Sequence, residues 1–204
     1  MHPTLLLLLV GLLYILVFGA LAYFRREGLS LRFAYEALAL TLVVCALSWG
    51  GLEIPSVLFL LLIYLLTMRV RLLVDLGNLY ARQGRFPFAN SIYALALRLW
   101  PDAANRLIVR VNQGTAKLQQ GALAEAIAAF KEVLQQAGAG HLGIKYEAAA
   151  HYNLGLAYRR NDQELLAVGE FRQVLDVWPV SECARRAQVC LKKDKQERKV
   201  DQNP

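Results

Sequence analysis

Residues 72–96 read LLVDLGNLYARQGRFPFANSIYALA and carry a spacing of small and aromatic residues that the chain repeats twice more. In each copy a Gly is followed seven residues later by a turn residue, five further on by an Ala, and four beyond that by an aromatic residue. The copies begin at Gly77, Gly114 and Gly155, at intervals of 37 and 41 residues. Self-similarity near this period, with helical spacing inside each copy, indicates a stack of helix pairs that bury their apolar faces against one another.

The small residues of each copy predict where its two helices approach most closely. The four positions are Gly77, Gly84, Ala89 and Tyr93 in the first copy, Gly114, Gly121, Ala126 and Phe130 in the second, and Gly155, Asp162, Ala167 and Phe171 in the third. We expect the two helices of a unit to press together at the Gly and the Ala, with the aromatic ring filling the seam between them. Pro101 and Pro179 are then well placed to end the second helix of the first and third units.

The first unit also contains the run L-x-x-L-G-x-x-Y from Leu73 to Tyr80, and with it the pattern resembles the tetratricopeptide repeat over about 110 residues. The resemblance implies three units, at residues 70–103, 107–140 and 148–181. The second is the poorest, because Lys117 stands where the others have an aromatic residue and no Pro closes it. A final helix at residues 181–195 is expected to cap the stack, and residues 196–204 are expected to form a disordered basic tail.

The N-terminal third is the apolar part of a chain that is 56% hydrophobic. Residues 5–24 carry no charge and are long enough, at about 30 Å, for a helix that crosses a bilayer. Residues 33–49 and 56–72 predict a helical hairpin interrupted by Gly50, Gly51, Glu53 and Pro55. Residues 1–68 are therefore interpreted as a membrane domain, and the fold class as all-α. No helix breaker separates Met68 from Val74, so the last membrane arm should continue into the first repeat helix, either straight or with a bend at the interface.

Arginines predict the orientation. With three crossings Arg25, Arg26, Arg32, Arg69 and Arg71 lie on one side, which the positive-inside rule makes cytoplasmic, together with the repeats. A single crossing with a re-entrant hairpin gives the same side, whereas two crossings reverse it. A signal peptide ending at the Ala20 and Ala22 pattern is disfavoured because its basic start is missing. We expect an integral protein of a plasma, inner or thylakoid membrane.

The resemblance implies a concave groove, lined by the first helices of successive units, that holds an extended peptide or a helix. Polar residues near the repeat glycines are its candidate lining. They are Asp75, Asn78, Asn112, Asn153, Tyr152, Arg71, Arg82 and Arg159. The alternative is that the asparagines satisfy groups within the stack. Val74 and Ala149 stand where relatives that clamp a C-terminal carboxylate have lysines, so binding of chaperone tails is not expected.

No catalytic motif or metal-ligand spacing occurs, so the sequence predicts neither an enzyme nor a metal or cofactor site. The net charge of +7 belongs to residues 69–204, where it either attracts anionic lipid headgroups or only solubilises the domain. Nucleic acid and small-molecule substrates are not expected. The expected partners are a protein or peptide in the groove and membrane lipids.

The leading hypothesis is a membrane-anchored adaptor that positions other proteins at the cytoplasmic face during assembly or maintenance of a membrane complex. A structural subunit without peptide binding is the alternative. In architecture alone the chain also resembles the membrane-anchored tetratricopeptide proteins of cyanobacteria and plastids that help to assemble photosystem I.

Overall fold

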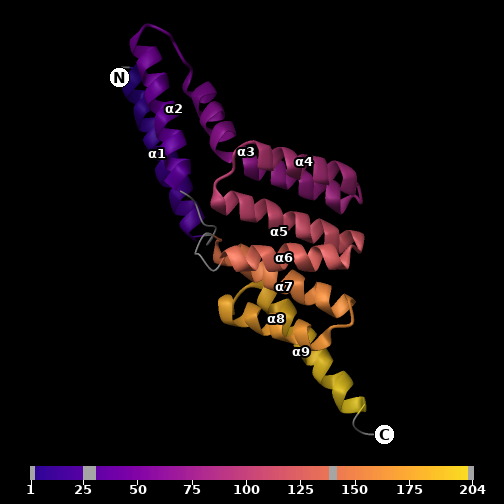
Figure 1. Ribbon diagram of the computed structural model, residues 1–204. Coiled ribbons are helices and arrows are strands. Elements are labelled where there is room, and N and C mark those ends of the chain that lie inside the picture. Colours follow the sequence, from indigo (N-terminus) through magenta and orange to yellow (C-terminus); the bar gives the residue numbers. More distant parts are fainter. Residues whose placement is uncertain (1–2, 25–30, 138–141, 202–204) are drawn as a thin grey trace.

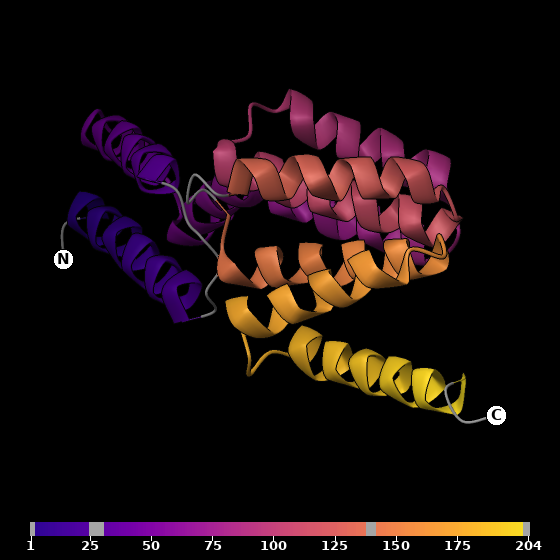
Figure 2. The same ribbon diagram turned by 60° about the horizontal axis from the view of Figure 1, so that its bottom comes forward.

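A computed structural model describes residues 3–24, 31–137 and 142–201, with residues 194–201 described by their backbone alone. Within these residues every regular element is a helix (Figure 1 and Figure 2), which confirms the all-α class. The helices are α1 (Pro3–Phe24), α2 (Leu31–Trp49), α3 (Ser56–Arg82), α4 (Phe86–Arg98), α5 (Ala103–Gln120), α6 (Leu123–Ala137), α7 (Ile144–Arg160), α8 (Glu164–Val177) and α9 (Glu182–Asp201). Figure 1 shows an N-terminal bundle at one end and a stack of helix pairs running away from it.

The bundle consists of α1, α2 and the first part of α3, with neighbouring helices running in opposite directions (Figure 1). Leu7, Phe33, Ala37, Phe59 and Ile63 form its buried centre. Most of its other leucines are exposed, so the bundle is apolar outside as well as inside. By length and composition alone, α1, α2 and α3 qualify as candidate membrane spans.

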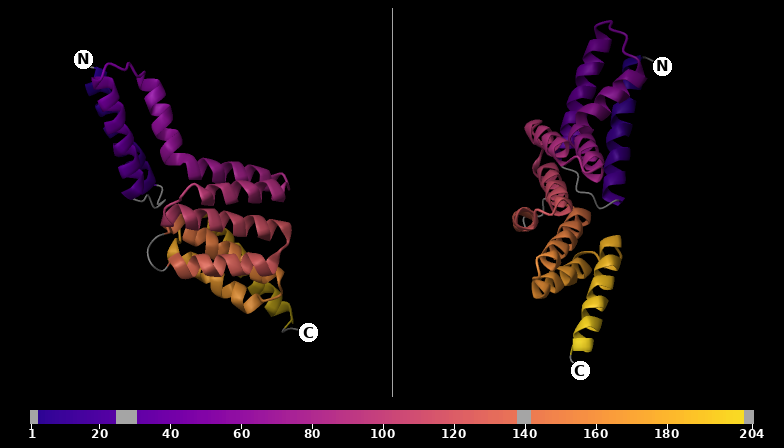
Figure 3. Two further views of the ribbon diagram at one scale, coloured as in Figure 1. Left: turned by 45° about the horizontal axis from the view of Figure 1, so that its top comes forward. Right: turned by 90° about the vertical axis from the view of Figure 1, so that its right-hand side faces the viewer.

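Helix α3 belongs to both parts of the molecule. It runs without interruption for 27 residues, from the bundle into the first repeat, as the absence of a breaker predicts. Figure 3 shows that it also bends sharply between the two parts. Near the bend, Thr67 Oγ1 donates to the carbonyl of Ile63 at 2.6 Å and Arg69 donates to the carbonyl of Leu66. Side-chain donors that bond to the preceding turn commonly accompany bends of this kind.

An ion pair beside the bend ties the bundle to the repeats. Arg69 binds Glu36 of α2 through both ends of its guanidinium, with Nη1 2.6 Å from Oε2 and Nη2 2.9 Å from Oε1. Its Nε also donates to the carbonyl of Leu99, at the end of α4, at 3.3 Å. Arg32 adds a second donor to Glu36 at 2.8 Å. One side chain therefore joins α2, α3 and the end of the first unit.

The seam within each repeat unit confirms the steric interpretation of the repeat glycines. A Cβ built on Gly77 would lie 2.4 Å from Cε1 of Tyr93, one on Gly114 2.9 Å from Cε1 of Phe130, and one on Gly155 2.7 Å from Cε1 of Phe171. All three rings are fully buried. Each unit is thus closed by an aromatic ring that lies directly on a glycine of the partner helix.

The turn residues of the three units share a backbone conformation. Gly84, Gly121 and Asp162 have φ values of 74°, 87° and 55°. L-residues with side chains rarely adopt this left-handed region, which explains why the position is Gly twice and Asp, one of the more tolerant residues, once. The start of α5 also has a local cause: the carboxylate of Asp102 accepts from the Asn105 amide at 2.7 Å, so the helix begins at Ala103 rather than at the expected residue 107.

The stack has an inner and an outer layer. Among the described residues α3, α5, α7 and α9 contact one another in succession, whereas α4, α6 and α8 do not. The described part of the second unit ends at Ala137. The capping helix buries Ala184, Ala187 and Cys190. It continues to Asp201, so residues 196–201 are helical where disorder is expected, because no Gly or Pro interrupts a run rich in good helix formers. Residues 202–204, like Arg25 and Arg26, lie outside the described residues.

Candidate functional site

The candidate groove residues fall into three places on the inner layer. Arg71 and Asp75 line a cavity between the bundle and the stack, which we call the junction cavity. Asn78, Arg82 and Asn112 line a second cavity farther along α3 and α5, which we call the groove cavity. The remaining three, Tyr152, Asn153 and Arg159, lie on α7. The structure therefore brings the first five together in two neighbouring groups.

The groove cavity has a volume of about 120 Å³ and lies between α3, α4 and α5. Its lining consists of Asn78, Ala81, Arg82, Tyr93, Asn112, Thr115, Ala116 and Gln119. The Tyr93 hydroxyl donates to Asn78 Oδ1 at 2.6 Å. Burial raises the pKa of Tyr93 to about 12, so the phenol stays a neutral donor. Because Asn78 accepts with its oxygen, its amide N–H groups can serve a ligand in the cavity.

Asn112 and Asn153 form internal hydrogen bonds. Asn112 Nδ2 donates to the carbonyl of Ile108 at 2.7 Å, within its own helix. Asn153 Nδ2 donates to Thr115 Oγ1 at 3.1 Å, which links α7 to α5. The side-chain N–H groups of both asparagines thus bond to groups within the stack, as the alternative interpretation predicts. Their carbonyl oxygens remain as acceptors toward the inner face.

The junction cavity has a volume of about 350 Å³ and places α1 against the repeats. Phe18, Leu21 and Ala22 of α1 line it together with Ile108 of α5 and with Lys145 and Tyr146 at the start of α7, while α3 adds Tyr64, Met68, Arg71, Leu72, Val74 and Asp75. The lining thus combines apolar side chains of α1 with charged side chains of both signs on α3 and α7.

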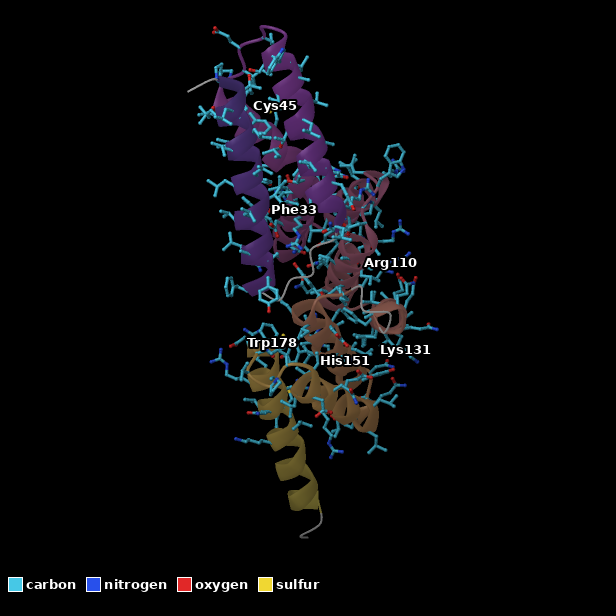
Figure 4. All side chains as sticks on the ribbon, turned by 90° about the vertical axis from the view of Figure 1, so that its left-hand side faces the viewer. Phe33, Cys45, Arg110, Lys131, His151 and Trp178 are labelled. Atoms are coloured by element: carbon cyan, nitrogen blue, oxygen red, sulfur yellow. The ribbon has the colours of Figure 1, made fainter. Side chains whose placement is uncertain are left out.

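The three candidates on α7 are held by packing. The ring of Tyr152 lies 6.0 Å from that of Phe171, and burial raises the pKa of its hydroxyl. Arg159 lies over the Phe171 ring, 5.8 Å from its centre. Nearby, His151 Nδ1 lies 2.7 Å from Glu170 Oε2 and joins α7 to α8; Figure 4 labels His151. These side chains stabilise the third unit, and Arg159 is half-buried.

Sequence reasoning missed two residues that line the groove cavity, Thr115 and Gln119, and a residue of α7 that contacts α5, Arg160. Thr115 follows Gly114 as Asn78 follows Gly77, so the repeat interval itself could have found it. Gln119 corresponds in the same way to Arg82. Arg160 donates to the carbonyl of Leu118 at 3.1 Å and fixes α7 against α5, a contact that no pattern along the chain indicates.

Comparisons with known proteins found a family model and similar solved structures. The model of the tetratricopeptide repeat family matches residues 68–138, which hold the first two units. Among solved structures, the N-terminal domain of stress-induced protein-1 (STI-1) from C. elegans is similar, with 21% sequence identity and a TM-score of 0.49 over 60% of this chain and 94% of that chain. A comparison with curated protein sequences gave no match. The match covers less than half of the chain; over residues 68–138 the chain is similar to tetratricopeptide repeats, which form a scaffold for protein–protein interaction that is generally not catalytic.

Proposed function

We propose that this chain is a membrane-anchored adaptor that holds a partner protein in its groove at the cytoplasmic face of a membrane, in the assembly or maintenance of a membrane complex. Helix α3 carries the proposal. Its first part completes a bundle of three apolar helices, and its second part is the first inner helix of the repeat stack. An interaction scaffold is therefore built directly onto a candidate anchor, without a linker between them.

Exposed side chains and charges support the membrane and its orientation. Leu13, Leu16 and Val57 leave most of their surface open, which suits a lipid environment better than water. The arginines near the repeat end of the bundle, Arg32 and Arg69, contrast with a far end whose connecting loop has only Glu53 as a charge. The positive-inside rule then favours the repeats on the cytoplasmic side.

The lining of the groove cavity suggests the chemistry of the partner. Arg82 is exposed beside the amides of Asn78, Asn112 and Gln119, and the cavity has room for a single side chain. A guanidinium flanked by amides suits a carboxylate together with the polar backbone of an extended peptide. We therefore propose an acidic segment of a membrane-complex subunit as the occupant.

Photo-crosslinking in native membranes tests this function. A photoreactive residue placed at Gln119 should crosslink a partner protein, which mass spectrometry of the adduct identifies. The same residue placed at Lys131, exposed on the outer helix α6 and labelled in Figure 4, should not. Arg82→Glu should abolish the Gln119 adduct, whereas Lys131→Glu, a charge reversal on the outer layer, should leave it intact.

A different crosslinking pattern would contradict the proposed adaptor function. Adducts that form only from probes in α1 and α2, with none from Gln119, would show a structural subunit whose repeats hold no peptide. Arg82 is a better test residue than the asparagines. Asn112→Asp and Asn153→Asp would each remove a donor that bonds within the stack, so a loss of binding could reflect a loss of packing.

A further inference from the structure

The first repeat unit has an apolar face that the second unit lacks. On α4, Phe88, Ile92, Leu95 and Leu99 recur at helical spacing and form what we call the outer stripe. Phe88 is 63% exposed and Leu95 46% exposed. On the repeat part of α3, Leu76 and Leu79 are similarly open at 42% and 52%. From Ala103 to Glu164, by contrast, no large hydrophobic residue of the described chain is exposed.

The repeat interval allows a position-by-position comparison with the second unit. At the shift of 37 residues that relates Gly77 to Gly114, Phe88 corresponds to Glu125, Leu95 to Glu132 and Leu99 to Gln136. Both glutamates are exposed in α6 and form ion pairs, Glu125 with Lys117 at 3.0 Å and Glu132 with Arg110. The equivalent face of α6, one unit farther from the bundle, is therefore polar. The fold of a repeat unit does not require an apolar stripe at these positions.

The position of the first repeat unit along the axis of the bundle explains why its outer face is apolar and that of the second unit is polar. The hydroxyls of Tyr14 and Thr67 lie 2.6 Å apart, so the bend of α3 is level with the middle of α1. Up to Thr67 the bundle arm of α3 covers about 18 Å, whereas the hydrocarbon core of a bilayer is about 30 Å thick. Beyond Tyr14, α1 continues without a charge for about 15 Å to Phe24. If the bundle is anchored in a bilayer, the ion pair of Arg69 and Glu36 beside the bend marks the membrane surface, and the first repeat unit lies beside the second half of α1 at the level of the headgroups.

The end of α4 carries a second sign of a membrane surface. Trp100 is 80% exposed and has a φ of 48°, a left-handed conformation that bulky side chains rarely adopt. Glycine is the usual residue at such a helix end. Tryptophan is instead enriched where a membrane meets water, because its ring is apolar and its N–H is polar.

Charge around the first unit suits anionic lipid headgroups. Between residues 69 and 102 there are five arginines and two aspartates, with no lysine or glutamate. Arg85 and Arg98 lie at the two ends of α4 and flank the apolar side chains. Each basic residue near an anionic membrane surface strengthens the attraction between the protein and the lipid.

We infer that the first repeat unit is itself seated in the headgroup region of the bilayer, with the outer stripe and Trp100 against lipid. This inference rests on the membrane anchoring of the proposed function and goes beyond it. No other described helix covers the side of the first unit opposite α5. In Figure 1 this side points toward the end of the molecule that holds the bundle. The occupant of the apolar face is therefore lipid, and the second and third units project from the membrane.

The three tryptophans of the chain make a direct test. The full chain is reconstituted in phosphatidylcholine and phosphatidylglycerol vesicles, as variants that keep only Trp49, only Trp100 or only Trp178 and have Phe at the other two positions. Quenching by lipids brominated on their acyl chains then reports contact with lipid. Trp49, 80% exposed at the end of α2, reports insertion of the bundle. We expect loss of Trp49 and Trp100 emission and little loss of Trp178 emission, with Trp100 quenched more by bromines near the headgroup than by bromines near the chain end.

A matched pair of variants isolates the outer stripe. Phe88→Glu with Leu95→Glu places the glutamates of the second unit at exposed positions of the first and should reduce the quenching of Trp100. Leu165→Glu with Leu166→Glu makes the same change at exposed leucines of α8 and should leave the quenching of Trp100 unchanged. Far-UV circular dichroism checks that both variants keep their helix content.

The outcomes separate this inference from the anchoring on which it rests. Quenching of Trp49 without quenching of Trp100 would overturn the inference and keep the anchor. If the emission of Trp100 then varied with the protein-to-lipid ratio, a second copy of the chain would be the occupant instead of lipid. Absence of quenching at Trp49 would overturn the membrane anchor and the inference together.

Discussion

Replacing Gly155 and Gly169 by alanine should change stability in opposite directions. Both glycines lie inside helices of the third unit, α7 and α8. A Cβ at Gly155 would lie 2.7, 2.8 and 3.1 Å from Cε1, Cδ1 and Cζ of the buried Phe171 ring, whereas one at Gly169 would meet no atom within 4 Å. The same chemical change therefore tests the seam at one position and only the backbone at the other.

The magnitudes follow from two terms. Alanine is favoured over glycine in a helix by about 1 kcal/mol, and both variants gain this. Gly155→Ala also overpacks a closed seam, which costs about 1–3 kcal/mol. Gly169→Ala should thus raise the free energy of unfolding by about 1 kcal/mol, and Gly155→Ala should leave it unchanged or lower it by up to about 2 kcal/mol. The difference between the variants cancels the propensity term and leaves the cost of the seam.

Urea unfolding of the full chain in detergent micelles measures this difference. The emission of Trp178, which is half-buried at the end of α8, reports the third unit once Trp49 and Trp100 are replaced by phenylalanine. Adding Phe171→Leu should recover part of the loss in Gly155→Ala, because the smaller side chain makes room for the new methyl group. Equal stabilisation by Gly155→Ala and Gly169→Ala would refute the steric reasoning for all three repeat glycines.

Three further changes test other contacts. Glu36→Gln removes the charge that binds Arg69 and should lower the free energy of unfolding by about 1–2 kcal/mol, given its partial exposure; an unchanged melting temperature by circular dichroism would contradict this. Asp162→Gly should raise it by about 0.5–1 kcal/mol in urea unfolding, because glycine adopts the φ of 55° without strain. The pKa of Tyr93 is about 12 in the folded chain and near 10.0 in the unfolded chain. The free energy of unfolding should therefore be unchanged below pH 10.0 and fall as the pH rises toward 12. Tyr93→Phe should reduce that fall in urea unfolding followed as a function of pH.

Local steric constraints made the repeat fold predictable. A glycine under an aromatic ring leaves the same spacing in every unit, so Gly77 with Tyr93 and Gly155 with Phe171 indicate the helix pairs without a structure. The continuity of α3 was predictable for a similar reason, because the chain has no breaker after Met68. Both features depend on residues that are close in sequence.

Contacts between distant helices were not predictable in this way. Nothing in α1 indicates that Phe18 lines a cavity with Ile108, and Glu36 and Arg69 give no sign of pairing across 33 residues. The donors of Asn112 and Asn153 were open alternatives because their partners depend on how α5 and α7 pack. The candidate groove residues lie on the inner helices α3, α5 and α7, while the contacts of their individual side chains needed the packed structure.

The absence of a linker in α3 limits which proteins a membrane-bound groove could reach. A scaffold on a flexible tether can bind a segment at many distances from the membrane and in many orientations. Here a bent but continuous helix, held by Arg69, fixes the distance and the orientation of the groove relative to the bundle. A partner of a membrane-bound groove would have to present its segment at that distance and in that orientation, so geometry would exclude many proteins whatever their sequence.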